Sequence, residues 1–289
     1  MTTDKKEKNA VAKGTLYLVA TPIGNMADIS ERAVKVLSEV DFVAAEDTRN
    51  SGLLLSRLGI SKPMISYFEH NKAERGRVIV DRLKGGESCA LVTDAGTPAI
   101  SDPGEDVARL CAEEGVPVTS IPGPAACITA LTLSALPTRR FVFEGFLPTD
   151  KKERRERLEG LASEMRTTVI YEAPHRLRAT LDELLLSLGD RKISLCRELT
   201  KLNEEVERTT VSGAIEIYKA KEPRGEYVLV IEGAGEKTES YPDDVLAHMR
   251  MYTSLGERKM DAIKRVARDR GISKSEAYDM VIKAEENEQ

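Results

Sequence analysis

The sequence predicts an α/β protein with two α/β domains, a ligand cleft and a small helical domain at its C-terminal end. Three observations support this. Short apolar, β-rich runs alternate with helical stretches along most of the 289 residues. Loops rich in glycine and proline follow several of the expected strands. Beyond Tyr241 the pattern is purely helical.

In the first half of the chain, strands and helices alternate regularly. Strands are expected at 15–20, 41–45, 64–67, 88–93 and 116–121. Helices are expected at 29–40, 51–58, 72–84, 105–114, and from 122–124 to about 134. Ser30 is placed to cap the first of these helices. The alternation predicts a mostly parallel sheet that helices cover on both faces.

A second series of elements follows residues 136–140. Strands are expected at 141–145, 167–172, 192–197, 205–210 and 227–232, with helices at 151–162, 176–188 and 213–220. Beyond a linker at 233–241, helices are expected at 260–268 and 273–284, separated by a turn at Gly271. The predicted organisation is a disordered tail (1–13), an N-terminal α/β domain (14–137), a C-terminal α/β domain (138–234) and a helical domain (241–289).

Composition limits the class of protein. The chain is 41% hydrophobic, so it can bury a large core without disulfides or metals. Its four cysteines are far apart, without metal-ligand spacing, which predicts free thiols, no metal site and a reducing compartment. No apolar run could span a bilayer, and the charged N-terminus is unlike a signal peptide. A cytoplasmic protein is therefore expected, and its net charge of -5 argues against wholesale wrapping of nucleic acid.

Three loops are expected to converge on one cleft. Residues 94–104 (DAGTPAISDPG) follow a strand, at the place where open α/β sheets bind ligands. Residues 20–25 (ATPIGN) and 122–126 (PGPAA) end two further strands. Small residues allow a ligand close to the backbone, and Asp94 could accept a hydrogen bond from a ribose or an amine. The loops contain neither GxGxxG nor a Walker sequence, which disfavours a nucleoside triphosphate.

Polar clusters follow other strands, and their roles stay open. Glu46, Asp47 and Arg49 fit either a helix start or the wall of the cleft. His175 fits a structural or RNA-facing residue better than a general base. Arg197 and Lys201 could contact phosphate or simply be solvated.

The C-terminal region carries a basic segment. Between Arg258 and Lys274 there are seven basic residues against two aspartates, a net charge of +5. A helix, a short glycine turn and a second helix resemble a helix-turn-helix that faces a nucleic-acid backbone. A helical hairpin packed on the body of the protein is an equal alternative.

The motifs together resemble one family, the small-subunit ribosomal RNA methyltransferases of type I within the tetrapyrrole (precorrin) methylase superfamily. The resemblance covers residues 14–233 and rests on this set of segments: TPIGN, AEDTRNSGLLLSRLGI, VTDAGTPAISDPG, SIPGPAA, FEGFLP, YEAPHR, CRELTK and RGEYVLVIEG. It implies two α/β domains of the tetrapyrrole methylase type with the cofactor in the cleft between them, a helical C-terminal domain and a homodimer. The implied reaction moves a methyl group from S-adenosylmethionine to the ribose 2′-oxygen of a cytidine in the decoding region of 16S rRNA, in the small ribosomal subunit.

The resemblance also implies site residues. For the cofactor they are Pro22, Ile23, Asp94, Ala95, Gly96, Ala99, Ala125, Ala126, Glu172, Leu199 and Gly225. The Asp-Ala-Gly-Thr-Pro sequence departs from the superfamily's Gly-Asp-Pro-like loop, so mostly backbone contacts are expected there. Polar candidates for the proton transfer are Glu46, Asp47, Glu198 and Lys201, with His175 behind them. For RNA they are Arg49, His175, Arg176 and Arg197, with Arg265 and Arg268 in the basic segment.

Three alternatives remain. A methylase acting on a tetrapyrrole or a protein would have a carboxylate-binding or acid-tolerant cleft and no basic helical segment. A non-catalytic RNA-binding protein could retain the cofactor fold. A nucleotide-binding regulator is disfavoured because the phosphate loop is missing.

Overall fold

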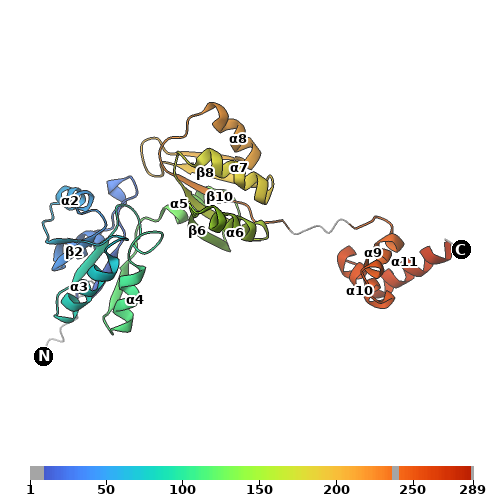
Figure 1. Ribbon diagram of the computed structural model, residues 1–289, viewed down its shortest axis with the longest axis horizontal. Helices are drawn as coiled ribbons and strands as arrows, with labels where there is room; N and C mark the ends of the chain where they lie inside the picture. The colour runs from blue at the N-terminus through green and yellow to red at the C-terminus, as the bar shows by residue number, and fades with distance from the viewer. Residues whose placement is uncertain (1–9, 236–240, 288–289) are drawn as a thin grey trace. The chain divides into compact units, whose positions relative to one another are not determined.

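The computed structural model describes residues 10–235 and 241–287 (Figure 1). Most of the predicted disordered tail, residues 1–9, and part of the predicted linker, residues 236–240, lie outside the described residues. The chain divides into two compact units, Met1–Ala234 and Gly235–Gln289. The first unit contains two five-stranded sheets, and the second is helical. The predicted α/β class is confirmed.

The first sheet is parallel throughout and has the strand order β3-β2-β4-β1-β5. Its strands are β1 (Leu16–Val19), β2 (Phe42–Ala45), β3 (Met64–Ser66), β4 (Cys89–Val92) and β5 (Val118–Ile121). Its helices are η1 (Met26–Asp28), α1 (Glu31–Glu39), α2 (Thr48–Arg57), α3 (Lys72–Lys84) and α4 (Glu105–Glu113). One buried cluster joins the sheet to α3 and α4, and another joins it to α1 and α2. The prediction of a parallel sheet covered on both faces is confirmed here.

The second sheet has the order β6-β7-β10-β8-β9 and mixed strand directions. Its strands are β6 (Phe141–Phe146), β7 (Thr167–Glu172), β8 (Lys192–Arg197), β9 (Glu205–Thr210) and β10 (Tyr227–Ile231). Only β6 and β7 pair in parallel; the other three pairs are antiparallel. The second half therefore differs from the first, for which the parallel sheet was predicted. The reason is that β9 follows β8 through a short connection, and β10 is buried along its whole length, as a parallel strand would be.

Helices pack on the second sheet unequally. One face is covered by α6 (Lys151–Ala162), α7 (Leu177–Leu188) and α8 (Val211–Ala220) in a single buried cluster. The other face receives α5 (Ala126–Leu133), whose Cys127, Ala130 and Leu131 pack against Val169 and Val230. Because α5 follows the last strand of the first sheet, it joins the two halves of the unit through a shared core (Figure 1).

The C-terminal unit contains α9 (Val245–Ser254), α10 (Lys259–Arg270) and α11 (Lys274–Asn287). The three helices share a core that includes Ile263, Val266 and Val281. At the start of α11, Ser273 Oγ accepts a bond from the Glu276 N–H, and Glu276 Oε2 accepts one from the Ser273 N–H. The predicted helix pair with its Gly271 turn is confirmed, and α9 completes the unit. No helix among residues 10–235 and 241–287 is long and apolar enough to cross a membrane.

Candidate active site

A cavity of about 370 Å³ lies where loops of the first sheet meet strands of the second. From the first half it is lined by Ile23, Glu46, Asp94, Ala95, Gly96, Asp102 and Ala126. From the second half it is lined by Phe146, Tyr171, Glu172, Ala173, Pro174, Cys196, Leu199, Glu226, Tyr227 and Val228. Several first-half residues follow the carboxyl ends of parallel strands, where α/β sheets usually bind ligands. Its volume is in the range of small-molecule pockets.

The charge of the lining is entirely of one sign. Five of the lining residues are acidic: Glu46, Asp94, Asp102, Glu172 and Glu226. Within the described part of the chain, no lysine, arginine or histidine lines this cavity. A cationic group would therefore be favoured inside it, whereas a polyanion such as a triphosphate would find no counter-charge.

Two of these acids hold their protons more tightly than usual. Burial raises the pKa of Asp102 to about 7, and the charges of Glu46 and Asp94 add to the effect. Burial also raises the pKa of Glu46, and the nearby charges of Asp94 and Asp47 act in the same direction. The shared cause is that several carboxylates face one partly dry space.

Hydrogen bonds hold the three predicted loops together. Thr21 and Gly96 exchange backbone bonds, with Thr21 N–H donating at 2.8 Å and Gly96 N–H at 3.1 Å. Thr97 Oγ1 donates at 3.0 Å to the carbonyl of Pro124 in the third loop. Gly96 has φ +83°, a conformation that side chains rarely adopt. The predicted convergence of the loops is confirmed.

A turn from the second half, residues 198–201, packs against the first loop. The Asn25 N–H donates at 3.1 Å to Thr200 Oγ1. A Cβ atom at Gly24 would lie 2.5 Å from Cγ of Lys201, so only glycine fits this approach. Glu198 and Thr200 both have positive φ, 51° and 64°. The contact lies beside Ile23 and Leu199, which both line the cavity.

Tyr171 forms an aromatic part of the wall. Its hydroxyl oxygen accepts a bond from the Cys127 N–H at 3.1 Å, which ties β7 to the start of α5. Phe143 and Phe146 meet its ring edge-on, with centroids 5.0 and 5.5 Å away. Burial raises the pKa of Tyr171, so its hydroxyl stays protonated at neutral pH.

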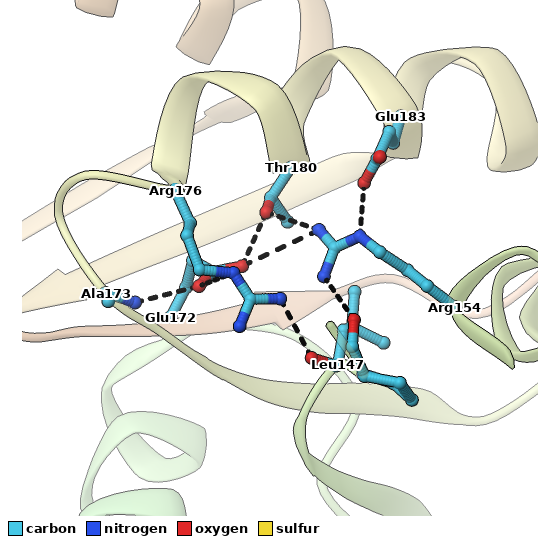
Figure 2. A network of polar contacts seen from close by, with 8 residues as sticks. Leu147, Arg154, Glu172, Ala173, Arg176, Thr180 and Glu183 are labelled. Atoms are coloured by element: carbon cyan, nitrogen blue, oxygen red, sulfur yellow. Dashed lines mark hydrogen bonds and ion pairs between the residues drawn. The ribbon is translucent and has the colours of Figure 1, made fainter. Parts of the chain in front are cut away.

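Glu172 is the centre of a buried polar network at the end of β7 (Figure 2). Its side chain is fully buried. Oε1 accepts the Ala173 N–H at 2.9 Å and lies 3.4 Å from Nε of Arg176. Oε2 accepts the Thr180 hydroxyl at 2.5 Å and lies 3.8 Å from Nη2 of Arg154. Buried charge is tolerated here because each oxygen has partners.

The two arginines of this network have further partners. Arg154 binds Glu183 through Nε at 2.6 Å and donates from Nη2 to Thr180 at 2.7 Å. Arg176 donates from Nη2 to the Leu147 carbonyl at 2.8 Å (Figure 2). These contacts fix the connection between β7 and α7. The structure thus gives Glu172 and Arg176 a structural role that the sequence did not suggest.

The structure brings together only part of the predicted site. The predicted cofactor residues that line the cavity are Ile23, Asp94, Ala95, Gly96, Ala126, Glu172 and Leu199. Those that do not line it are Pro22, Ala99, Ala125 and Gly225. Among the predicted proton-transfer residues, Glu46 lines it, whereas Asp47, Glu198 and Lys201 do not. The predicted phosphate-binding residues Arg49, His175, Arg176 and Arg197 are also outside the lining.

Ion pairs account for several of the outlying residues. Lys201 Nζ lies 2.9 Å from Glu198 Oε1 and 2.9 Å from Glu226 Oε2. Lys201 therefore balances the charge of Glu226, which lines the cavity, without lining the cavity itself. Arg49 pairs with Asp47 at 2.6 Å and holds the pKa of that carboxyl at about 2.

The two other residues predicted to bind RNA in this half have different surroundings. Arg197 pairs with Glu205 at 2.9 Å. His175 is exposed to solvent.

The sequence did not single out Asp102, Phe146 or Tyr171 as site residues, whereas Glu226 belongs to the Gly225-Glu226 turn that the resemblance matched to the cofactor site. Asp102 belongs to the loop that was singled out, and Tyr171 directly precedes Glu172 in a quoted motif. The only sign in the sequence that Asp102 and Tyr171 belong to the site is that each lies in or beside a motif. Which side chain faces the cavity depends on strand pairing between β7 and β10, which one sequence does not give.

In the C-terminal unit, the two predicted RNA-binding arginines have different surroundings. Arg265 pairs with Glu257 and lies over the ring of Tyr252, 4.4 Å from its centroid. Arg268 is 74% exposed, with its Nε 3.8 Å from Asp269. Arg265 thus contributes to the packing of the unit, and Arg268 presents its charge to solvent.

The described residues contain no group of His, Cys, Asp or Glu side chains that could hold a metal ion. The four cysteines are buried free thiols.

Comparison with known folds supports the reading of the architecture. The chain superposes on a cobalt precorrin-4 methyltransferase of cobalamin biosynthesis with a TM-score of 0.56 and 18% identity, covering 76% of this chain and 95% of the other. It superposes on a diphthine synthase with a TM-score of 0.59 and 14% identity, covering 76% and 89%. At these identities the likeness shows a shared fold.

Sequence comparison is more specific. Residues 15–215 match the family described as Tetrapyrrole (Corrin/Porphyrin) Methylases. The chain is 46% identical to ribosomal RNA small subunit methyltransferase I of Halalkalibacterium halodurans, covering 97% of this chain and 99% of the relative. It is 43% identical to the protein of the same name from Bacillus subtilis, covering 92% and 93%. The chain therefore belongs to the tetrapyrrole methylase family and, within it, to the ribosomal RNA small subunit methyltransferase I proteins.

Proposed function

We propose that this chain uses S-adenosylmethionine to methylate the ribose 2′-oxygen of a cytidine in the decoding region of 16S rRNA. The proposed substrate is the RNA within the small ribosomal subunit, and the proposed compartment is the cytoplasm. The relatives' names supply the class of RNA. A homodimer is also proposed, on the family resemblance.

The single observation that carries the proposal is the acidic lining of the cavity. S-adenosylmethionine carries a sulfonium, an ammonium and one carboxylate group and is a net cation. The lining has five acidic residues and no basic side chain from the described residues. Glu172 and Glu226 are paired with basic residues outside the lining, which leaves Glu46, Asp94 and Asp102 to attract a cation. Attraction between unlike charges is strongest in a partly buried site. The same lining gives no counter-charge to a nucleoside triphosphate or to a tetrapyrrole with several carboxylates.

The residues present fit this donor in shape and in chemistry. Ile23, Leu199 and Val228 provide apolar surface for a flat nucleoside, while Asp94 and Glu46 provide acceptors for its polar groups. Gly96 keeps the backbone open beside Ile23. When bound, the donor supplies a methyl group on a positively charged sulfur. The protein's part is to exclude water and to hold the attacking hydroxyl in line.

The RNA must reach the cavity with one nucleotide separated from its neighbours, because a stacked base would block the ribose. The exposed Arg49 and His175, which flank segments leading into the cavity wall, are suited to phosphate contacts beside it. Arg176 and Arg197 are less suited, because their side chains are only 24% and 20% exposed, whereas Arg49 is 88% exposed although it pairs with Asp47. Arg268, whose charge faces solvent, is proposed as the RNA contact of the helical unit, whereas Arg265, also predicted from the sequence, is paired with Glu257 within the unit.

The experiment uses small ribosomal subunits purified from cells that lack this modification. They are incubated with the full-length chain and methyl-labelled S-adenosylmethionine, and the label is mapped by nuclease digestion and mass spectrometry. Label on one ribose 2′-oxygen in the decoding region is expected. Label on a base would overturn the ribose assignment. Absence of label from RNA would favour a non-catalytic RNA-binding protein or a methylase with another substrate.

A further inference from the structure

Four side chains that line the cavity form one row across the second sheet. Strand pairing aligns them in order from β6 through β7 and β10 to β8: Phe146, Tyr171, Val228 and Cys196. Because neighbouring strands lie about 4.8 Å apart, the row is roughly 14 Å long. The row is therefore longer than a single nucleobase.

Exposure to solvent falls along this row. Phe146 is 53% exposed, Tyr171 is partly buried, Val228 is 6% exposed and Cys196 is fully buried. The buried end also has Leu199, which follows β8 and is 6% exposed. This end suits a small donor that is shielded from water. A large RNA reaches the row only at its exposed end, where Phe146 lies.

A bulge in β6 places the Phe146 ring on the cavity face of the sheet. The pairing of β6 with β7 shifts register between Phe143 and Gly145 and skips Glu144. Side chains alternate between the two faces of a strand, so without the shift Phe143 and Phe146 would lie on opposite faces. With the shift both rings meet Tyr171 edge-on, at 5.0 and 5.5 Å. Gly145 has φ +63°, which suits a bulge of this kind.

Both neighbours of Phe146 are held in place. Ser101 Oγ occupies the space that a side chain at Gly145 would take, so the bulge packs against the loop that follows β4. The Leu147 carbonyl accepts a hydrogen bond from Nη2 of Arg176 at 2.8 Å (Figure 2). An exposed aromatic ring is therefore presented to the cavity on a fixed backbone.

We propose that the ring of Phe146 stacks on the base of the nucleotide whose ribose is methylated, a role that rests on the proposed function. Aromatic side chains bind splayed, single-stranded bases in this way. The acidic lining admits a neutral base more readily than a phosphate, which stays outside beside exposed cations such as Arg49. The base at the exposed end of the row brings its ribose toward the donor at the buried end. Stacking tolerates any base, so Phe146 holds the nucleotide and does not select cytidine.

The first test distinguishes the RNA base from the donor's adenine, the other flat group that fits this ring. The chain has no tryptophan, so Phe146→Trp introduces a single indole there. Incorporated as 5-hydroxytryptophan, it is excited at wavelengths where ribosomal tryptophans do not absorb. We expect loss of its emission when unmodified small subunits are added and no change with S-adenosylmethionine alone.

Phe68→Trp, labelled in the same way, is the matched control, because Phe68 is 38% exposed and does not line the cavity. Its emission should change with neither addition. Quenching of Phe146→Trp by the donor alone, or equal quenching at both positions, would overturn the proposal.

The second test measures methyl transfer to unmodified small subunits in single turnovers. Phe146→Leu keeps an apolar side chain and removes the flat ring. It should bind the donor within about threefold of the unaltered chain, but the ratio of maximal rate to half-saturating subunit concentration should fall about tenfold or more, as expected for one lost base stack. Phe146→Tyr should recover most of the loss, and Phe68→Leu should cause none. A parallel loss of donor affinity, or an unchanged ratio in Phe146→Leu, would overturn the proposal.

The stacking role and the proposed function fail in different ways. If the unaltered chain labels the ribose and Phe146→Leu labels it equally fast, only the role of Phe146 is wrong. If small subunits quench Phe146→Trp but the unaltered chain labels no ribose, the ring binds RNA and the proposed reaction is wrong.

Discussion

The Thr180 hydroxyl donates a hydrogen bond of 2.5 Å to Oε2 of Glu172 and accepts one of 2.7 Å from Arg154. Thr180 is fully buried on α7, and the Glu172 side chain is fully buried at the end of β7. The hydroxyl therefore connects an anion and a cation that lie 3.8 Å apart, Glu172 Oε2 and Arg154 Nη2. Through it, the wall of the cavity is joined to the helical layer behind the sheet (Figure 2).

We expect Thr180→Val to lower the free energy of unfolding by about 1.5–3 kcal/mol, the usual effect of removing a buried hydrogen bond to a charged group. Valine keeps the shape of threonine but leaves Glu172 and Arg154 each one partner short. Urea denaturation would measure the loss. Thr180→Ser is the matched control, because it removes a methyl group and keeps the hydroxyl. An equal loss in both variants would show that packing, and not the hydroxyl, matters here.

The contact of Gly24 with residues 199–201 gives a second prediction. In Gly24→Ala the new Cβ would lie 2.5 Å from Cγ of Lys201 and 3.0 Å from the Leu199 carbonyl oxygen. The two walls that carry Ile23 and Leu199 must then separate, and we expect donor affinity to fall about tenfold or more, since misplacement of about 1 Å is costly at a site. Calorimetric titration would measure it. Gly160→Ala, in the open on α6, should leave affinity unchanged and increase stability slightly.

Substitution of Gly96 can distinguish the effect of backbone strain on stability from the effect of a new side chain on donor binding. Gly96→Asp places a side chain at φ +83° beside Ile23, in the cavity lining. Gly86→Asp imposes similar strain at φ +91°, with nothing within 4 Å of the new Cβ. We expect both variants to lose about 1 kcal/mol of stability and only Gly96→Asp to lose donor binding. Equal donor affinity in the two variants would mean that the 94–104 loop does not contact the donor.

Asp102 also makes stability depend on pH. Its pKa of about 7 in the folded chain is above its ordinary value of 3.8, so the folded chain binds this proton more tightly than the unfolded chain. The stabilisation is complete below about pH 4 and is lost as the pH rises through 7. At pH 8 Asp102→Asn should therefore be more stable than the unaltered chain, by on the order of 1–2 kcal/mol after allowance for partial solvent access.

Thermal unfolding of Asp102→Asn and the unaltered chain between pH 5 and 8 would measure this dependence. The difference between the two should shrink toward acid pH. A constant difference across the range would contradict the raised pKa.

Much of the fold followed from local patterns. The helix expected at 72–84 is α3 with the same bounds, because its apolar residues face one side and Gly85 and Gly86 end it. The helix expected from residue 51 begins at Thr48, because Asp47 accepts the Arg49 N–H and caps it. The direction of β10 could not be predicted in this way. It depends on pairing with β7 and β8, which lie well before it in the chain, and burial along its whole length is also typical of a parallel strand. The direction of β9 follows from its short connection to β8.

The site was predictable in its loops and less so in its side chains. The approach of residues 20–25, 94–104 and 122–126 follows from their position after neighbouring parallel strands. The partners of Glu172 and Arg176 depend on α6 and α7, which the YEAPHR motif does not reveal. The pKa of Asp102 is raised first by its burial and then by the spatial proximity of Glu46 and Asp94, which are 56 and 8 residues away in sequence.

The last prediction concerns two arginines of the helical unit that the sequence treated alike. Arg268→Gln removes an exposed charge and should weaken binding to the small subunit while leaving stability within about 0.5 kcal/mol. If Arg268 contacts phosphate, the slope of log affinity against log salt should become shallower by about one. Arg265→Gln should instead destabilise the unit, because Glu257 and the Tyr252 ring lose their partner.

Unfolding curves and filter-binding titrations at several salt concentrations would distinguish the two arginine variants. An unchanged salt slope in Arg268→Gln, with full stability, would assign α10 to packing and remove Arg268 from the RNA contacts. A stable Arg265→Gln with a reduced slope would reverse the roles of the two residues. The two arginines differ in that one is held in an ion pair and the other is exposed to solvent. The net charge of +5 in the segment does not show this difference.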